Sequence, residues 1–129
     1  MTPWVPIGGT SLARPSPMPN PLIHWELMVS DVDRAKAFYQ RVFDWSFTPQ
    51  GPEYTLIECG AEPGGGLMKR PPGVPMSALN SYFRVVDLDR TLRDAVEAGA
   101  TVIVPRMEVP TVGWFAMFVD PDKIPIGVM

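Results

Sequence analysis

The sequence predicts an α+β fold in which two tandem β-α-β-β-β modules form one domain. Its 129 residues are enough for a single compact domain and too few for two independent ones. The 16 prolines and 11 glycines, set among 46% hydrophobic residues, are typical of short strands separated by many turns. The second half of the chain also repeats the pattern of the first half.

The repeat becomes visible when residues 28–49 are laid over residues 84–105 at a shift of 56. The matching pairs are Val29 with Val85, Asp31 with Asp87, Asp33 with Asp89, Arg34 with Arg90, and Pro49 with Pro105. Two copies are too few for a solenoid, so each must bury its apolar face against the other. We expect a single domain over residues 22–129, with modules at about 22–70 and 80–129 and a proline-rich linker at 71–79.

An N-terminal arm precedes the domain. Residues 1–21 carry six prolines and no apolar periodicity, which predicts an extended segment outside the core. Trp4, Val5 and Ile7 form an apolar exception that suits docking on a neighbouring groove or subunit.

The first module opens with a strand and a helix. Residues 23–29 alternate, with Trp25 and Leu27 on one face and His24 and Glu26 on the other. Asp31 is the expected N-cap of a helix. The apolar stripe of that helix should cover the Trp25 face, and it consists of Ala35, Phe38, Tyr39 and Val42. Short strands are expected near 45–48, 54–59 and 66–69.

The second module repeats this order. Residues 80–86 alternate like the first strand. A second helix follows, and its core-facing stripe is expected to consist of Thr91, Leu92, Ala95 and Val96. Gly99 suits the left-handed position after a helix C-terminus. Three strands should complete the module, at 101–104, 114–119 and 124–129.

Charge and composition exclude several classes of function. A net charge of -3 without a basic run gives no electrostatic surface for nucleic acid. No apolar run is long enough to span a bilayer and the N-terminus does not resemble a signal peptide, so we expect a soluble cytoplasmic protein. Cys59, the one cysteine, cannot form an internal disulfide and is expected to be a small buried residue.

The motifs "VSDVDRAKAFYQRVFDW" and "FVDPD", at their spacing in a duplicated chain, resemble the glyoxalase, bleomycin-resistance and extradiol dioxygenase superfamily, also called vicinal oxygen chelate proteins. The resemblance covers residues 22–129. It implies curved sheets around a shared cavity, helices on the convex side, and a homodimer. Two exposed sheet edges also favour pairing on physical grounds.

The resemblance further implies where a metal would bind. Metal-dependent members use four ligand positions, on the first and last strands of each module. In this sequence those positions are His24, Gly66, Asn80 and Gly127, of which only His24 is a usual ligand.

Two residues on the first strand are candidates for acid/base catalysis: His24 and Glu26. Residues expected to line the cavity and contact a ligand are Met28, Met68, Asn80, Tyr82, Arg84 and Phe115. An apolar environment would raise the pKa of the Glu26 carboxyl toward that of a general base, whereas an ion pair with Arg84 would keep it ionised. In the second case we expect His24 to form a hydrogen bond with Asn80 or with the backbone.

The sequence favours a metal-independent protein without a cofactor that binds an apolar or aromatic small molecule between the modules. The alternative is a lyase, isomerase or dioxygenase that uses His24 with a divalent metal such as Zn, Ni, Mn or Fe. A third reading is an interaction module whose cavity is filled by its own side chains. Whether the protein is an enzyme stays open at this point.

Overall fold

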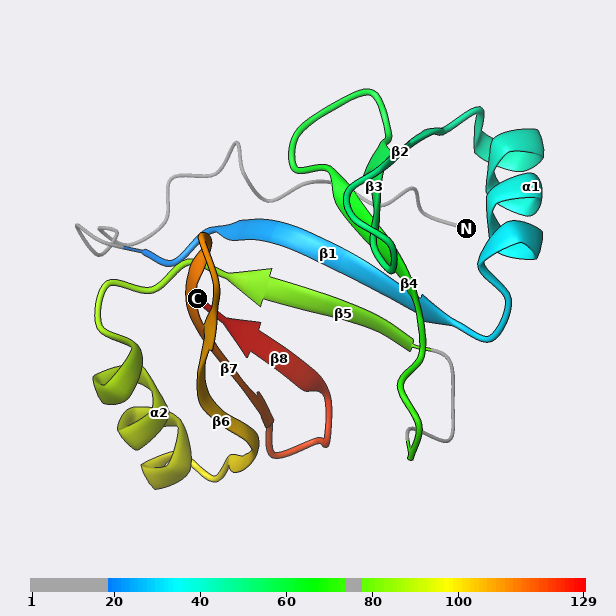
Figure 1. Cartoon of the computed structure of the whole chain (residues 1–129). Coiled ribbons are helices and arrows are strands. Elements are labelled where there is room, and N and C mark those ends of the chain that lie inside the picture. The colour runs from blue at the N-terminus through cyan, green and yellow to red at the C-terminus, as the bar shows by residue number, and fades with distance from the viewer. Residues whose placement is uncertain (1–18, 74–77) are drawn as a thin grey trace, which may run out of the picture.

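The computed structural model describes residues 19–73 and 78–129 and contains the two expected modules (Figure 1). The first consists of β1 (Leu22–Val29), α1 (Val32–Phe43), β2 (Ser46–Pro49), β3 (Thr55–Glu58) and β4 (Gly65–Lys69). The second consists of β5 (Ala78–Phe83), α2 (Leu88–Glu97), β6 (Thr101–Val109), β7 (Gly113–Val119) and β8 (Pro125–Val128). Trp4, Val5 and Ile7 of the predicted arm lie outside the described residues.

The two modules join into one curved eight-stranded sheet with the strand order β2-β3-β4-β1-β5-β8-β7-β6. β1 and β5 pair antiparallel at its centre, while β1 with β4 and β5 with β8 are parallel pairs. Across the central pair, Glu26 lies opposite Asn80 and His24 lies opposite Tyr82. Because the repeat relates His24 to Asn80 and Glu26 to Tyr82, a local two-fold axis passes between β1 and β5.

Both helices begin where the sequence predicts. Asp31 accepts a hydrogen bond from the Arg34 N–H at 3.0 Å, and Asp87 accepts one from the Arg90 N–H at 3.0 Å. Both are N-cap bonds, so the cap expected at Asp31 is confirmed, and Asp87, its counterpart in the repeat, caps α2 in the same way. Gly99 follows α2 with a φ of +108°, a conformation that suits glycine.

α1 covers the β1 face only in part. Tyr39 stacks on Trp45 with ring centroids 5.1 Å apart, and Trp45 lies 5.3 Å from Trp25. The other edge of the predicted stripe faces outward, since Phe38 is 56% exposed and Val42 is 51% exposed. The helix lies beside the outer half of its module rather than over the centre of the sheet, and Figure 1 shows α1 and α2 at opposite flanks.

Strand bounds differ from the prediction mainly at β5 and β6. β5 begins at Ala78, two residues before the expected start. β6 continues through Pro105 to Val109, with register shifts against β7 on both sides of Val104. A proline is tolerated there because β6 is an edge strand that pairs only with β7. A residue without an N–H therefore costs no hydrogen bond to a strand on the other side. In the part of the chain that the structure describes, no helix is long and apolar enough to cross a membrane.

Candidate functional site

The Glu26 carboxylate is held by two tyrosines at the centre of the sheet. The Tyr54 hydroxyl donates to Oε1 at 2.9 Å and the Tyr82 hydroxyl donates to Oε2 at 3.1 Å. Glu26 is buried, with 9% of its surface exposed. The bond to Tyr82 joins equivalent positions of the two modules, so the carboxylate links them across the local two-fold axis.

His24 extends this network from the same face of β1. Its Nε2 lies 2.7 Å from the Tyr54 hydroxyl oxygen. Because Tyr54 donates its single proton to Glu26, the hydrogen bond from His24 requires the tautomer in which Nε2 carries the proton. Nδ1 then remains as an acceptor, and the network runs from His24 through Tyr54 and Glu26 to Tyr82.

Burial and charge fix the protonation of the ring groups. Burial raises the pKa of Tyr54 and of Tyr82, and the negative charge and hydrogen bonds of Glu26 raise both pKa values further. Burial lowers the pKa of His24, although the Glu26 charge opposes this effect. Both tyrosines are therefore hydrogen-bond donors at neutral pH, and the imidazole is neutral.

Two glycines make room for the tyrosines. Gly66 on β4 pairs with Glu26, and Gly127 on β8 pairs with Tyr82. A Cβ at Gly66 would overlap the Tyr54 hydroxyl, and a Cβ at Gly127 would overlap the Tyr82 ring. Each glycine therefore leaves space that a tyrosine fills.

This network forms the floor of a cavity of about 730 Å³. We use "floor" for His24, Glu26, Tyr54 and Tyr82. The walls are apolar and consist of Ile23, Leu56, Val109, Phe115 and Met129. The rim consists of the exposed residues Gln50, Arg84, Thr111 and Val112.

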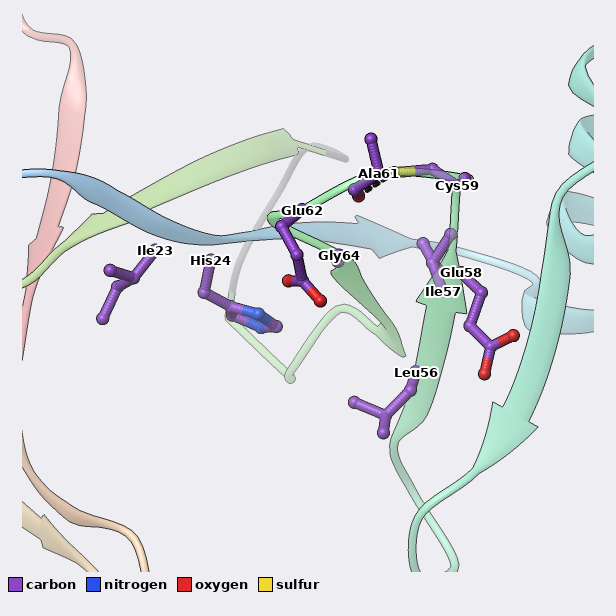
Figure 2. Close-up of a pocket in the computed structure, with 11 residues that line it drawn as sticks. Ile23, His24, Leu56, Ile57, Glu58, Cys59, Ala61, Glu62 and Gly64 are labelled. Atoms are coloured by element: carbon purple, nitrogen blue, oxygen red, sulfur yellow. Dashed lines mark hydrogen bonds between the residues drawn. The ribbon is translucent and has the colours of Figure 1, made fainter.

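A second pocket of about 630 Å³ adjoins the first and shares Ile23, His24 and Leu56 with it. Figure 2 shows the side chains of His24 and Glu62 directed into this pocket. Cys59 is half-buried beside it, and its thiol donates to the Ala61 carbonyl at 3.3 Å. His24 therefore lines both pockets.

The structure brings together some of the expected ligand contacts. Tyr82, Arg84 and Phe115 line the cavity with His24 and Glu26. Three others do not line it: Met28, Met68 and Asn80. All three occupy strand positions that alternation assigns to the face of His24 and Glu26. The cavity, however, lies toward the end of β1 that carries His24.

Two of the interactions considered for Glu26 and His24 take a different form. Glu26 is bonded to Tyr54 and Tyr82 rather than paired with Arg84, and His24 bonds to Tyr54 rather than to Asn80. Tyr54 was not among the expected site residues. Its alternation with Leu56 in the 54–59 strand pattern is the one signal that placed both on a common face.

The donor set does not fit the family's metal site. Two of the four positions are glycines without a donor atom, and the space above them holds Tyr54 and Tyr82. Within residues 19–73 and 78–129, no three side chains of His, Cys, Asp or Glu gather so as to hold a metal ion. The described side chains therefore do not supply the ligand set that the resemblance implies.

Residues 22–128 match the model of the Glyoxalase/Bleomycin resistance protein/Dioxygenase superfamily. The chain belongs to this superfamily, as its motifs predicted.

Among curated proteins, the chain is similar to "Putative glyoxylase CFP32" of Mycobacterium bovis and of Mycobacterium tuberculosis. Each is 37% identical over 113 residues, which are 84% of this chain and 43% of the relative. The chain thus spans less than half the length of these relatives.

Solved structures share the fold at low sequence identity. Methylmalonyl-CoA epimerase from Mycobacterium tuberculosis matches with a TM-score of 0.62 at 16% identity, covering 83% of this chain and 85% of that one. An extradiol ring-cleaving dioxygenase from B. fuscum matches with a TM-score of 0.62 at 21% identity, covering 84% and 31%. The Mn(II)-bound glyoxalase from Novosphingobium aromaticivorans matches with a TM-score of 0.58 at 21% identity, covering 83% and 37%. These similarities establish the fold of the chain. The activity is inferred from the site itself.

Proposed function

We propose that this domain is a metal-independent small-molecule-binding protein that holds an apolar or aromatic ligand between its two modules. The observation that carries the proposal is the Tyr54–Glu26–Tyr82 network, whose tyrosines fill the space at Gly66 and Gly127, two of the four ligand positions that the resemblance implies. A cavity of about 730 Å³ above it is within the usual size of small-ligand sites, roughly 300–1,000 Å³.

The walls suit such a ligand. Phe115 offers an aromatic face, Met129 a side chain that adapts its shape, and Leu56 and Val109 aliphatic surface. Few polar groups reach the interior, and those of the floor are fixed by one another. Apolar contact would supply most of the affinity, and the floor would orient the ligand.

Binding of a neutral probe tests this proposal. Titration of the full chain with 2-naphthylmethanol, followed by calorimetry, should show one site. Val109→Trp should abolish binding because the indole fills the cavity, whereas Ile103→Trp on the same strand should leave it intact, since Ile103 is 50% exposed and does not line the cavity. Binding that survives Val109→Trp, or a parent that binds no naphthyl probe, neutral or charged, would contradict the proposal.

A second candidate is an enzyme in which His24 and Glu26 perform acid/base chemistry. It is favoured by the name of the curated relatives and by a buried carboxylate within a hydrogen-bond network that includes a histidine. A lyase, isomerase or dioxygenase that depends on Zn, Ni, Mn or Fe would need ligands besides His24. Conversion of a bound ligand, detected by mass spectrometry and lost in Glu26→Gln, would favour this candidate over simple binding.

We extend the proposal to a cytoplasmic homodimer without nucleic-acid or membrane partners. Support comes from the outward edge of α1, where Phe38, Val42 and Phe43 are each at least half exposed. Apolar patches of this kind favour association. Analytical ultracentrifugation should give a dimer that Phe38→Glu dissociates; a monomeric parent would contradict this part of the proposal.

A further inference from the structure

The floor of the cavity offers acceptors and no donor. The hydroxyls of Tyr54 and Tyr82 donate to Glu26, and the His24 Nε2 proton is directed at Tyr54. The second acceptor near the Tyr82 hydroxyl is the Met117 sulfur at 3.9 Å, a weaker one than the carboxylate. A carboxylate has about four acceptor sites, of which two are used here. The groups left for a ligand are therefore the remaining lone pairs of Glu26 and Nδ1 of His24.

The charge on Glu26 also lacks a cationic partner. Both of its hydrogen-bond donors are neutral hydroxyls. The ion pairs of Arg90 with Asp94 and of Arg106 with Asp89 lie on the exposed surface and do not involve Glu26. A buried carboxylate without a counter-charge is costly, and an arriving cation would recover part of that cost.

Arg84 is the cation nearest in the chain to the floor, two residues beyond Tyr82. It lies on the exposed rim of the cavity and not beside Glu26. A ligand must pass this charge, which disfavours a cation at the mouth, but exposure to water screens the repulsion.

We infer that the cavity takes an apolar molecule with a protonated amine or amidine head, directed at the Glu26 carboxylate and the His24 Nδ1. The inference rests on the proposed function and adds the chemical class of the ligand. An ammonium or amidinium group has several N–H donors and no acceptor, and so complements a floor that has only acceptors. An anionic head would face both the carboxylate and the lone pair of the imidazole.

Three probes that share one ring test this assignment. 2-Naphthylmethylamine, 2-naphthylmethanol and 2-naphthoate are titrated into the full chain at neutral pH and low salt. The amine should bind about tenfold more tightly than the alcohol, because charge-assisted hydrogen bonds are roughly twice as strong as neutral ones, and the carboxylate should bind most weakly.

Two variants locate the source of the preference. Glu26→Gln should make the amine and the alcohol bind equally. Glu97→Gln, which removes the same charge from an exposed end of α2, should leave the preference unchanged. If Glu26→Gln does not fold, Tyr82→Phe gives an independent test, because it keeps the carboxylate and frees one of its acceptor sites, so the amine preference should persist or grow.

The outcomes separate the two claims. Equal binding of amine and alcohol by the parent would overturn the inference and leave the proposed function standing. Loss of the amine preference in Tyr82→Phe would also overturn it, because the phenol would then be the recognition group. Binding of none of the three probes would overturn the proposed function itself.

Discussion

The two modules supply unequal halves of one site. The first module contributes His24, Glu26 and Tyr54, and the second contributes Tyr82 to the floor. Glu26 and Tyr82 hold equivalent positions of the repeat, yet one is the acceptor and the other the donor of the same hydrogen bond. Two glutamates at these positions would repel, and two tyrosines would leave no charge in the cavity. Divergence of the copies therefore created a polar centre that neither copy has alone.

The glycines show a second difference between the modules. Gly66 faces the hydroxyl tip of Tyr54, whereas Gly127 faces Cγ, Cδ1 and Cε1 of the Tyr82 ring. A small rotation about χ1 displaces the hydroxyl end of a tyrosine by more than it displaces Cγ and Cδ1, which lie nearer the backbone. The second module should tolerate change at its glycine less well than the first.

The largest expected effect concerns the face of β1 away from the cavity. Trp25→Ala should lower the free energy of unfolding by about 3 kcal/mol, because it removes the contact with Trp45 and a hydrogen bond to the Pro63 carbonyl at 2.9 Å. Urea denaturation measures this loss. Trp114→Ala is the matched control, since Trp114 is 46% exposed and should cost less than about 1 kcal/mol. Equal losses would mean that the faces of β1 are assigned wrongly.

The next largest effect sharpens the comparison of the glycines. Gly127→Ala should destabilise the fold by about 1–3 kcal/mol, as overpacking of a buried site does. Gly66→Ala should cost less because Tyr54 can move. Urea midpoints of the two variants, measured together, check the order. The reverse order would show that Tyr54, and not Tyr82, is the fixed ring of the floor.

A smaller effect follows from the lowered pKa of His24. Below the ordinary histidine pKa of about 6.5, the unfolded chain takes up a proton that the folded chain resists. Stability from this residue is therefore present above that pH and is lost as the pH falls toward the lowered pKa. The melting temperature should fall more between pH 8 and pH 5 in the parent than in His24→Gln, and His24 is the one histidine in the sequence. An identical fall in both proteins would contradict the assignment.

The smallest effect concerns the rim. Arg84→Gln should raise the affinity for 2-naphthylmethylamine by about twofold at low salt, because a screened positive charge leaves the mouth of the cavity. Calorimetry at two salt concentrations measures it, with the difference shrinking at the higher one. A loss of amine affinity in this variant would place Arg84 in direct support of the ligand.

Local patterns made much of the fold predictable. The N-caps Asp31 and Asp87 and the alternation around Glu26 depend on neighbouring residues, and the 56-residue repeat fixed the equivalence of the modules. The superfamily followed from motifs spread over the same segments.

The site was predictable only in part. Alternation assigns a residue to a face of a strand but not to a place along it, which is why Met28 and Met68 were expected in a cavity that lies nearer His24. Tyr54 precedes β3, and its reach to Glu26 depends on the pairing of β3, β4 and β1. That contact is tertiary, and no local pattern reports it.

We propose that the tyrosine network stands in the place of a metal centre. Elemental mass spectrometry of the untagged chain, after incubation with zinc, nickel, manganese and iron(II) and then desalting, tests it most directly. We expect no stoichiometric metal in the parent and none in His24→Ala. Near-stoichiometric metal in the parent that is lost in His24→Ala would contradict it and establish a metal site that uses His24.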